Sequence, residues 1–282
     1  MIKKCKRIKG LIFIISLILI SAISCYVENN WIETEYIKVE VNNFPKELSG
    51  LKIAHLSDVH LPKNASSIDN IILKIKSQSP DLILLTGDII DESADIENCG
   101  LDKLCEGLSE IAQTYAISGN HEVWNNNLER WTKILTNNNV KVIDNQTEVY
   151  VKHSKSIAIV GLKDEYELKQ ESVKDLEKAK GIPMILVAHR PELFSSYFTD
   201  SSSVRPSIVF TGHAHGGQFR IPFFNKGVVA PNQGFLPKYT SGFYLSKGNE
   251  KMIISRGLGN SIIPIRINNR PHLPIVELVN PR

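Results

Sequence analysis

The chain has 282 residues, of which 42% are hydrophobic and 22% charged. This composition excludes a disordered or low-complexity chain and suits a folded protein with one large core or two small ones. The formal net charge is +3, but five cations lie in the first nine residues, so the remainder is slightly acidic. We therefore expect no binding of nucleic acid through a broad basic face.

The first expected element is an apolar segment that directly follows a cluster of basic residues. Residues 11–27 form a run of 17 without charge, near the lower limit for a membrane-spanning helix. We predict that residues 1–27 form a signal anchor or uncleaved signal peptide, so that the protein crosses the cell membrane once. By the positive-inside rule the catalytic domain would be extracytoplasmic. A buried core helix is the weaker interpretation, because of the preceding Lys3, Lys4, Lys6, Arg7 and Lys9.

The four cysteines leave one alternative anchor open. Cys25 closes the apolar run in the sequence SAISC, which resembles a bacterial lipoprotein cleavage site, although Ala22 stands where leucine is usual. Lipid anchoring through Cys25 is therefore the alternative to a transmembrane anchor. Cys5, Cys99 and Cys105 lack CxxC spacing, and we expect Cys99 and Cys105 to remain unpaired thiols.

A polar linker, residues 28–35, is expected to lead into one catalytic domain over residues 36–282. Alternating apolar residues predict a strand in IKVEVNNFP, and LKIAHLSD predicts a buried strand. Amphipathic spacing predicts a helix over Ser66–Gln78, which Pro80 ends. The pattern of strand and helix then recurs at Leu82–Thr86, Leu101–Ile111, Thr114–Ser118 and Leu128–Thr136. Repeated βα units indicate a layered α/β arrangement.

The second half of the chain is richer in expected strands. We predict a helical stretch over Glu165–Lys180, and strands and loops from Phe219 onward. Short strands are expected at Glu148–Val151, Ile157–Leu162, Met184–Ala188 and Ser207–Thr211.

Five apolar runs end abruptly in aspartate, asparagine or histidine. Because a sheet fixes the ends of its strands, loops at those ends can bring such side chains together. Oxygen and nitrogen donors suit manganese, zinc or iron, and seven of them exceed the needs of one tetrahedral zinc ion. Two divalent metal ions that share one carboxylate would use the whole set: Asp58, His60, Asp88, Asn120, His189, His213 and His215.

The motifs DVH, GD, GNHE, VAHRP and GHAHGGQ, in that order between residues 51 and 218, resemble the calcineurin-like metallophosphoesterase superfamily. The stretches GHAHGGQFRIP and SRGLGNS resemble its membrane-associated bacterial phosphodiesterase branch, which includes the YkuE and YaeI proteins. The resemblance implies an α/β (α+β) fold of four layers, in which two packed mixed β-sheets are flanked by helices. Here that domain would follow an N-terminal membrane helix.

The same resemblance implies roles for individual residues. One metal would bind Asp58, His60 and His215, the other would bind Asn120, His189 and His213, and Asp88 would bridge them. A metal-bound hydroxide would then attack phosphorus in line. His121 would be catalytic and would assist the leaving oxygen or stabilise developing charge, with Glu122 expected to hydrogen-bond its other ring nitrogen.

These expectations favour a membrane-anchored phosphodiesterase or pyrophosphatase, with a lipid-linked phosphate ester as one candidate substrate. A phosphomonoesterase is the main alternative, and a non-catalytic metal-binding interaction module is the weaker one. Arg190 and Arg256 are open between phosphate binding and ordinary ion pairing. Outside the ligand set, His55 is expected in a core or edge strand, and His153 and His272 in loops. The sequence predicts no oligomeric state.

Overall fold

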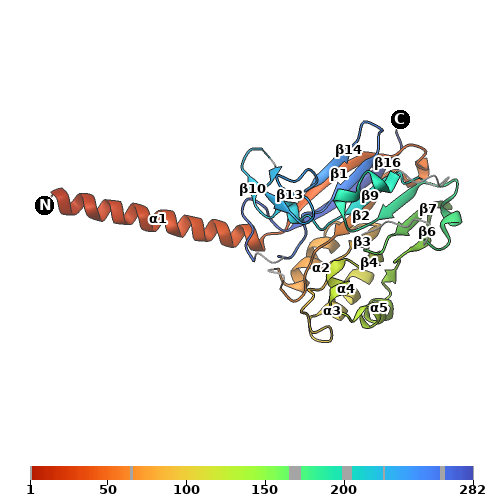
Figure 1. Ribbon diagram of the computed structural model, residues 1–282, viewed down its shortest axis with the longest axis horizontal. Helices are drawn as coiled ribbons and strands as arrows, with labels where there is room; N and C mark the ends of the chain where they lie inside the picture. Colours follow the sequence, from red (N-terminus) through yellow and green to blue (C-terminus); the bar gives the residue numbers. More distant parts are fainter. Residues whose placement is uncertain are drawn as a thin grey trace.

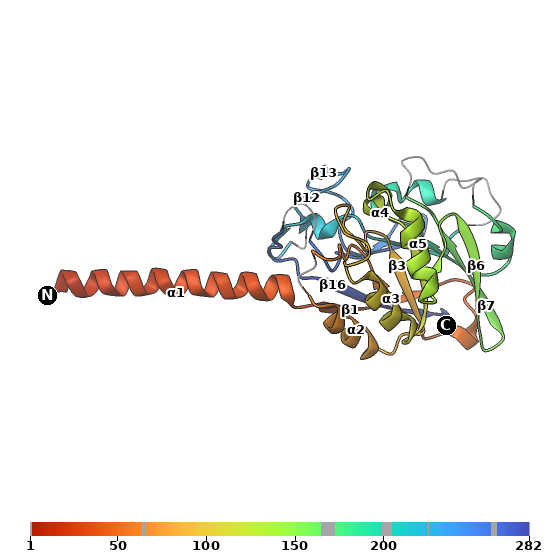
Figure 2. The same ribbon diagram turned by 90° about the horizontal axis from the view of Figure 1, so that it is seen from below.

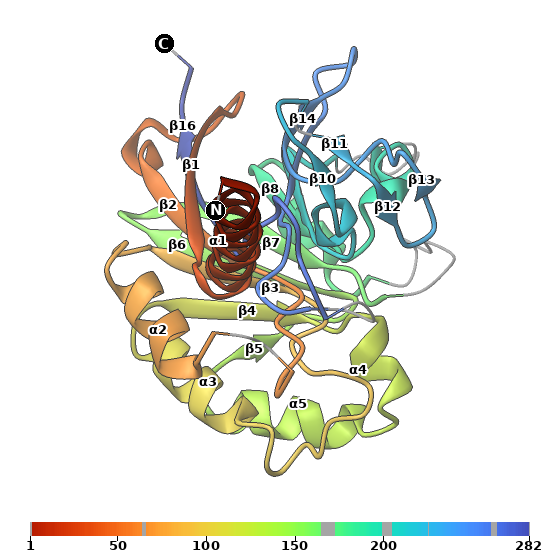
Figure 3. The same ribbon diagram turned by 90° about the vertical axis from the view of Figure 1, so that its left-hand side faces the viewer.

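A long N-terminal helix, α1 (Ile2–Asn30), projects from a body that is built on two six-stranded mixed sheets (Figure 1). The computed structural model describes residues 2–63, 66–164, 173–198, 205–224, 226–260 and 264–281. The two sheets pack face to face, and helices cover the outer face of the first (Figure 3). This is the predicted layered arrangement of two mixed sheets flanked by helices.

The first sheet has the strand order β1-β16-β2-β3-β4-β5. Its C-terminal strand β16 lies between β1, to which it runs parallel, and β2, to which it runs antiparallel. The last strand of the chain therefore lies inside the first sheet, between β1 and β2. The bounds are β1 (Glu33–Glu40), β2 (Leu51–Leu56), β3 (Leu82–Thr86), β4 (Gln113–Ile117), β5 (Lys141–Val142) and β16 (His272–Val279).

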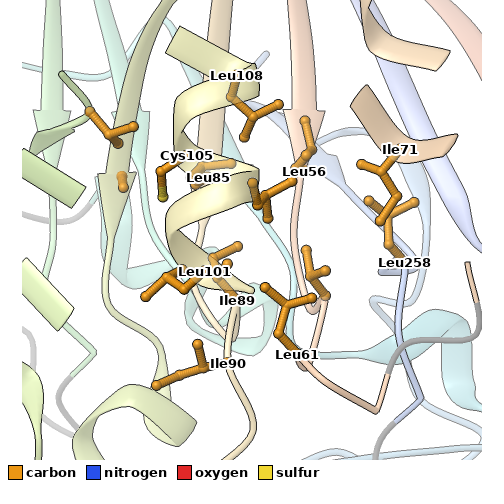
Figure 4. Close-up of a cluster of buried hydrophobic side chains, with 14 of the residues drawn as sticks. Leu56, Leu61, Ile71, Leu85, Ile89, Ile90, Leu101, Cys105, Leu108 and Leu258 are labelled. Carbon is orange, nitrogen blue, oxygen red and sulfur yellow. The ribbon is translucent and has the colours of Figure 1, made fainter. Parts of the chain in front are cut away.

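Three amphipathic helices cover this sheet. They are α2 (Ile68–Lys76), α3 (Leu101–Ser109) and α5 (Leu128–Asn137). The hydroxyl of Ser67 caps α2 by accepting a hydrogen bond from the Asn70 N–H at 3.2 Å. Helix α3 buries residues at positions 101, 104, 105 and 108, a spacing that gathers them on one face. That face packs against leucines of β2 and β3 in the cluster of Figure 4.

The second sheet has the order β14-β15-β9-β8-β7-β6. A core that includes Leu84, Tyr115, Ile159 and Phe210 fills the space between the two sheets. In the part of the chain that the structure describes, short 3₁₀ turns cover its outer face: η3 (Leu176–Ala179), η4 (Pro191–Leu193) and η5 (Ser196–Phe198). The strands are β6 (Gln146–Lys152), β7 (Lys155–Gly161), β8 (Met184–Val187), β9 (Ile208–Thr211), β14 (Gly242–Leu245) and β15 (Lys251–Ile254).

Two small hairpins lie at the end of the body nearest α1 (Figure 1). One pairs β10 (Arg220–Ile221) with β11 (Lys226–Gly227), and the other pairs β12 (Val229–Ala230) with β13 (Gly234–Phe235). Between β9 and the first hairpin lies the 3₁₀ turn η6 (His215–Gly217).

Two predicted boundaries differ from the structure. Residues 28–35, expected as a linker, contain the last turn of α1 and the start of β1, and only Trp31 and Ile32 separate them. Of the helix predicted over Glu165–Lys180, residues 165–172 lie outside the described residues, and the remainder contains only the η3 turn. The prediction that Cys99 and Cys105 remain unpaired is confirmed.

Helix α1 has the length and composition of a membrane span over Lys9–Asn30, the one such helix among the described residues. None of the apolar window is buried inside the protein. Because its large side chains are exposed along its length, α1 is no core helix, and the weaker interpretation of residues 11–27 is wrong.

Candidate metal centre

All seven expected ligands lie together where the strands of both sheets end. Asp58, Asp88 and Asn120 follow β2, β3 and β4 of the first sheet, and Asn120 begins the short helix α4 (Asn120–Trp124). His189 follows β8, and His213 and His215 follow β9, in the second sheet. β2, β3 and β4 run parallel to one another, as do β8 and β9, so each sheet brings its polar ends to one edge.

One group of ligand atoms surrounds Asp58. Its Oδ1 lies 3.3 Å from His215 Nε2, which in turn lies 3.2 Å from His60 Nε2. The Nε2 of His60 is 3.9 Å from Asp88 Oδ2. These three residues, Asp58, His60 and His215, offer ligand atoms within 4.8 Å of one another.

A second group surrounds His189. Its Nε2 lies 3.2 Å from Asp88 Oδ2, 3.2 Å from Asn120 Oδ1 and 3.1 Å from His213 Nδ1. Asp88 Oδ2 therefore faces both groups, and the seven residues divide into two sets that meet at one carboxylate.

The backbone at these positions is unusual. Five of the seven residues have positive φ: Asp58, His60, Asp88, His213 and His215. Non-glycine residues rarely adopt this left-handed region, and such strain collects at functional sites. The turns also need glycine, because a Cβ added at Gly212 would lie 1.7 Å from Ser57 Oγ and 2.4 Å from Asp58 Oδ2.

Hydrogen bonds orient the ligand side chains. The Nδ1 of His189 donates to the carbonyl of Thr86 at 2.7 Å, which leaves its Nε2 for the site. The backbone N–H of His213 donates to Asp58 Oδ2 at 3.0 Å. The buried side chain of Asn269 donates to the carbonyls of His215 and Gln218 at 2.8 and 3.1 Å, and so fixes the turn that carries His215.

Glu122 has a different role from the predicted one. Its carboxylate accepts hydrogen bonds from four backbone N–H groups at 2.7–3.0 Å and makes no contact with the His121 ring that the structure records. The predicted bond from Glu122 to His121 is therefore wrong, because the turn after β3 needs these acceptors. The donors are Asp88, Ile89, Ile90 and Gly119.

His121 lies beside the two groups and is nearly buried, at 8% exposure. Its Nδ1 accepts a hydrogen bond from the Glu92 N–H at 3.1 Å. A neutral ring then carries its proton on Nε2, which lies 4.0 Å from Asp88 Oδ2. The Trp124 ring, 5.4 Å away between centroids, borders the same side chain.

Burial and mutual repulsion set the charges of the cluster. Burial lowers the pKa of His60 to about 4 and, together with neighbouring imidazoles, holds the pKa values of His213 and His215 well below the usual range. Burial alone would raise the pKa of Asp88, but the adjacent His189 outweighs it and lowers that pKa. Burial raises the pKa of Asp58 to about 6, and for His189 the nearby Asp88 outweighs burial and raises the pKa to about 10. His60, His213 and His215 are therefore neutral and Asp88 is ionised, the forms that bind cations, whereas His189 would have to release its proton to bind a metal.

The donor set fits two divalent cations. Within the described residues, the buried His60 Nδ1 and His215 Nδ1 have no hydrogen-bond partner, and their Nε2 atoms face each other. Two imidazole nitrogens and a carboxylate oxygen in one buried space suit a cation better than a stable hydrogen-bond network.

The two arginines left open by the sequence are both paired. Arg190 makes two bonds of 2.7 Å to Asp164, and its Nη1 lies 3.4 Å from His213 Nε2. Arg256 bonds to Glu33 at 2.8 Å. Each guanidinium group therefore has a carboxylate partner, and Arg190 also lies within reach of the expected ligand His213.

Of the three remaining histidines, His272 departs from its prediction. It was expected in a loop, but it begins β16, is fully buried and bonds to Glu35 at 2.8 Å. His55 lies in β2 and contacts Thr86, as expected of a core strand residue, and His153 lies in the turn between β6 and β7.

A layered fold of two mixed sheets, with an oxygen and nitrogen ligand cluster where their strands end, defines a metallophosphoesterase architecture. The chain belongs to the calcineurin-like phosphoesterase family, whose sequence model matches residues 51–217.

Its relatives include members of the predicted bacterial branch. It is 33% identical to the uncharacterised metallophosphoesterase Cj0846 of Campylobacter jejuni, over 88% of this chain and 65% of that protein, so it spans less than two thirds of that relative. It is 28% identical to the uncharacterised metallophosphoesterase YkuE of Bacillus subtilis, over 90% and 87%. It is also 28% identical to phosphodiesterase YaeI of Escherichia coli, over 90% and 91%. The predicted resemblance to the YkuE and YaeI branch is thereby confirmed.

Sequence reasoning missed the residues that support the site. Asn269 lies 54 positions from His215, and Thr86 acts through its carbonyl, so neither stands in a motif with its partner. Asn232, whose Nδ2 is 3.2 Å from His213 Nε2, was also missed. The polar run INNRP around Asn269 is the one local signal that these residues offered.

Proposed function

We propose that this protein is a membrane-anchored phosphodiesterase or pyrophosphatase that uses two divalent metal ions, with manganese, zinc or iron as candidates. The observation that carries the proposal is the convergence of two ligand groups on Asp88 Oδ2. Membership of the phosphoesterase family and the similarity to the phosphodiesterase YaeI support it.

The first metal would bind Asp58, His60 and His215, and the second would bind Asn120, His189 and His213. Asp88 would bridge them. A bridging carboxylate offsets the repulsion between two cations about 3.5–4 Å apart. When bound, such a pair supplies an activated water molecule and stabilises charge on the phosphate oxygens.

His121 would then act as the general acid. Because its Nδ1 accepts the Glu92 N–H, its Nε2 proton is directed toward the bridging carboxylate and the space beside it. From there it can donate that proton to the leaving oxygen. The Glu122 carboxylate keeps the turn after Asp88 in place.

Helix α1 would hold the enzyme in the cell membrane. The basic residues at the N-terminus would stay in the cytoplasm, so the catalytic domain would lie outside. An anchor would keep the enzyme at the membrane surface, where lipid-linked phosphate esters are concentrated. We therefore prefer these esters as the substrate class. Lipidation of Cys25 is the alternative means of anchoring, and Cys25 is exposed.

The test uses the full chain in detergent, stripped with a chelator and then supplied with manganese or zinc. Its substrates are bis-(p-nitrophenyl) phosphate and p-nitrophenyl phosphate. We expect cleavage to return with metal and to favour the diester. A preference for the monoester would assign a phosphomonoesterase, and two bound metals without cleavage of either compound would favour a non-catalytic interaction module.

A further inference from the structure

The last turn of α1 is fixed to the catalytic body by side-chain hydrogen bonds. Asn29 donates to the carbonyl of Arg266 at 3.1 Å and accepts from its N–H at 2.8 Å. Glu28 accepts the N–H of Asn269 at 3.0 Å and pairs with Arg270 at 3.3 Å. The helix therefore meets the body at a fixed place, the segment 264–270.

Beside these bonds, α1 and the body flank an open, mainly apolar pocket of about 580 Å³. On the helix it is lined by Ile20, Ser24, Cys25 and Glu28, and on the body by Pro222 and residues 265–268. Ile20 is eight residues before Glu28, so the pocket extends about 12 Å along the helix toward its N-terminus.

The length of the apolar run places this contact within the membrane. The 17 uncharged residues 11–27 span about 25 Å as a helix, whereas the hydrocarbon core is about 30 Å thick. The whole run is needed to cross the core, so Ile20 and Ser24 must lie inside it. The parts of the body beside them then reach the bilayer too.

The side chains of the body at this level suit such a position. We define the docking surface as Phe223, Phe224, Ile265 and Ile267, whose exposed fractions are 104%, 71%, 45% and 56%. The first two lie in the turn between β10 and β11, beside α1 (Figure 1). Four large exposed apolar side chains around the end of a membrane helix are costly in water and stable in lipid.

The charge of the surrounding chain agrees. Residues 221–240 contain two lysines, Lys226 and Lys238, and no acidic residue. Lys226 and Lys238 are exposed and lie close in sequence to Phe224 and Leu236. Cations beside exposed apolar residues favour a surface of anionic headgroups.

We infer that the catalytic domain docks on the outer leaflet of the bilayer that α1 crosses, by inserting Phe223, Phe224, Ile265 and Ile267 among the acyl chains. The inference rests on the membrane anchoring in the proposed function. Its consequence for the site is direct: Asn269, in the docked segment, bonds to the carbonyl of His215, so the metal centre is held at a fixed height near the lipid phosphates.

The test measures the depth of single positions in the full chain, reconstituted in phospholipid vesicles. Cys5 and Cys25 are replaced by serine, while the buried Cys99 and Cys105 remain. A polarity-sensitive fluorophore is attached in separate variants, Phe223→Cys, Ile18→Cys and Val151→Cys. Ile18 lies within α1, and Val151 is an equally exposed apolar residue on β6, which lies at the far end of the body (Figure 1).

We expect the labels at 18 and 223 to shift to the blue and to be quenched by lipids with brominated acyl chains, and the label at 151 to do neither. Quenching at 18 without quenching at 223 would overturn the docking. A blue shift at 223 without bromolipid quenching would assign the surface to a second copy of the chain. No quenching at 18 would show that α1 does not cross the membrane, and docking would fall with it.

Turnover of the water-soluble diester in the same vesicles separates the two proposals. If the diester is cleaved but position 223 stays in water, docking alone is refuted. If position 223 is quenched but neither model ester is cleaved, docking stands and the proposed catalytic function fails.

Discussion

The first sheet supplies Asp58, His60, Asp88 and Asn120 to the candidate metal centre, and the second sheet supplies His189, His213 and His215. We call these two sets the first and the second share of the ligands. Different kinds of contact hold the two shares in place. The turn after β3 is fixed by a nearby side chain, because Glu122 accepts hydrogen bonds from four backbone N–H groups around Asp88. The turn after β9 is fixed by Asn269, which is distant in the sequence and whose backbone N–H donates to Glu28 of α1. The position of His215 therefore depends on a segment that is also bonded to α1.

The largest effect should come from a substitution that disturbs both groups of ligand atoms at once. Asp88→Asn removes the charge that faces both ligand groups, so we expect both metals to bind weakly and turnover to fall by at least about 10⁴-fold. The measurements are metal content after dialysis and the rate of diester cleavage. Asp95→Asn makes the same change at an exposed site and should alter neither. Retention of two metals by Asp88→Asn would refute the bridging role.

His121 tests whether a residue of the first share acts without holding metal. His121→Ala should keep both metals and lower the rate by about 10²–10⁴-fold, because proton donation to the leaving oxygen is lost. The loss should be larger for a poor leaving group than for p-nitrophenol. The measurement compares the rates for two such diesters, with His153→Ala as the control at an exposed histidine. Metal loss equal to that of Asp88→Asn would make His121 a ligand instead.

The sequence predicted the ligands of the first share correctly placed after their strands, but it did not predict the contacts that hold these ligands in position. Strands β2, β3 and β4 appear within one or two residues of their predicted bounds, because continuous apolar runs such as LILLT identify buried strands directly. Asp58, Asp88 and Asn120 stand just after these runs, so the hydrophobic pattern that predicts each strand also locates the ligand at its end. Glu122 was recognised as important, but its true partners are backbone groups that the side-chain sequence does not reveal.

The second share shows what sequence could not supply. His189, His213 and His215 stood out beside their strands, but the residues that fix them come from distant segments. Asn269 meets His215 only because β16 returns to the first sheet and brings the segment before it to this edge. Likewise, the linker expected over 28–35 became the end of α1 and the start of β1, since Glu28 and Asn29 find partners in that segment.

The local support of the first share can be broken alone. Glu122→Gln keeps the size of the side chain but replaces one carboxylate oxygen with an amide donor, which faces backbone N–H groups. Hydrogen bonds to a buried charged group contribute about 1.5–3 kcal/mol each, so the free energy of unfolding should fall by at least about 2 kcal/mol. Metal affinity should fall about 10–100-fold. Thermal unfolding and metal titration measure the two effects, and an unchanged melting temperature would contradict this role.

Asn269 supports the second share from a distant part of the sequence. Its substitution should give the smallest effect, and the effect should be confined to one metal. Asn269→Ala removes the two bonds to the carbonyls of His215 and Gln218. We expect the metal bound by His215 to lose about 10–100-fold in affinity, while the other metal is retained, because the carbonyls that the Asn269 side chain holds belong to His215 and Gln218 and not to His189 or His213.

The readout is a two-step metal titration followed by calorimetry, beside the rate of diester cleavage at saturating metal. Asn268→Ala is the matched control, because the side-chain amide of Asn268 donates to the carbonyl of Arg220 and, among the described residues, to neither His215 nor Gln218. A purely structural role would weaken both metals together and lower the rate even when both sites are filled. Loss of one metal with recovery at saturation would show that the segment beside the membrane helix sets the position of His215 alone.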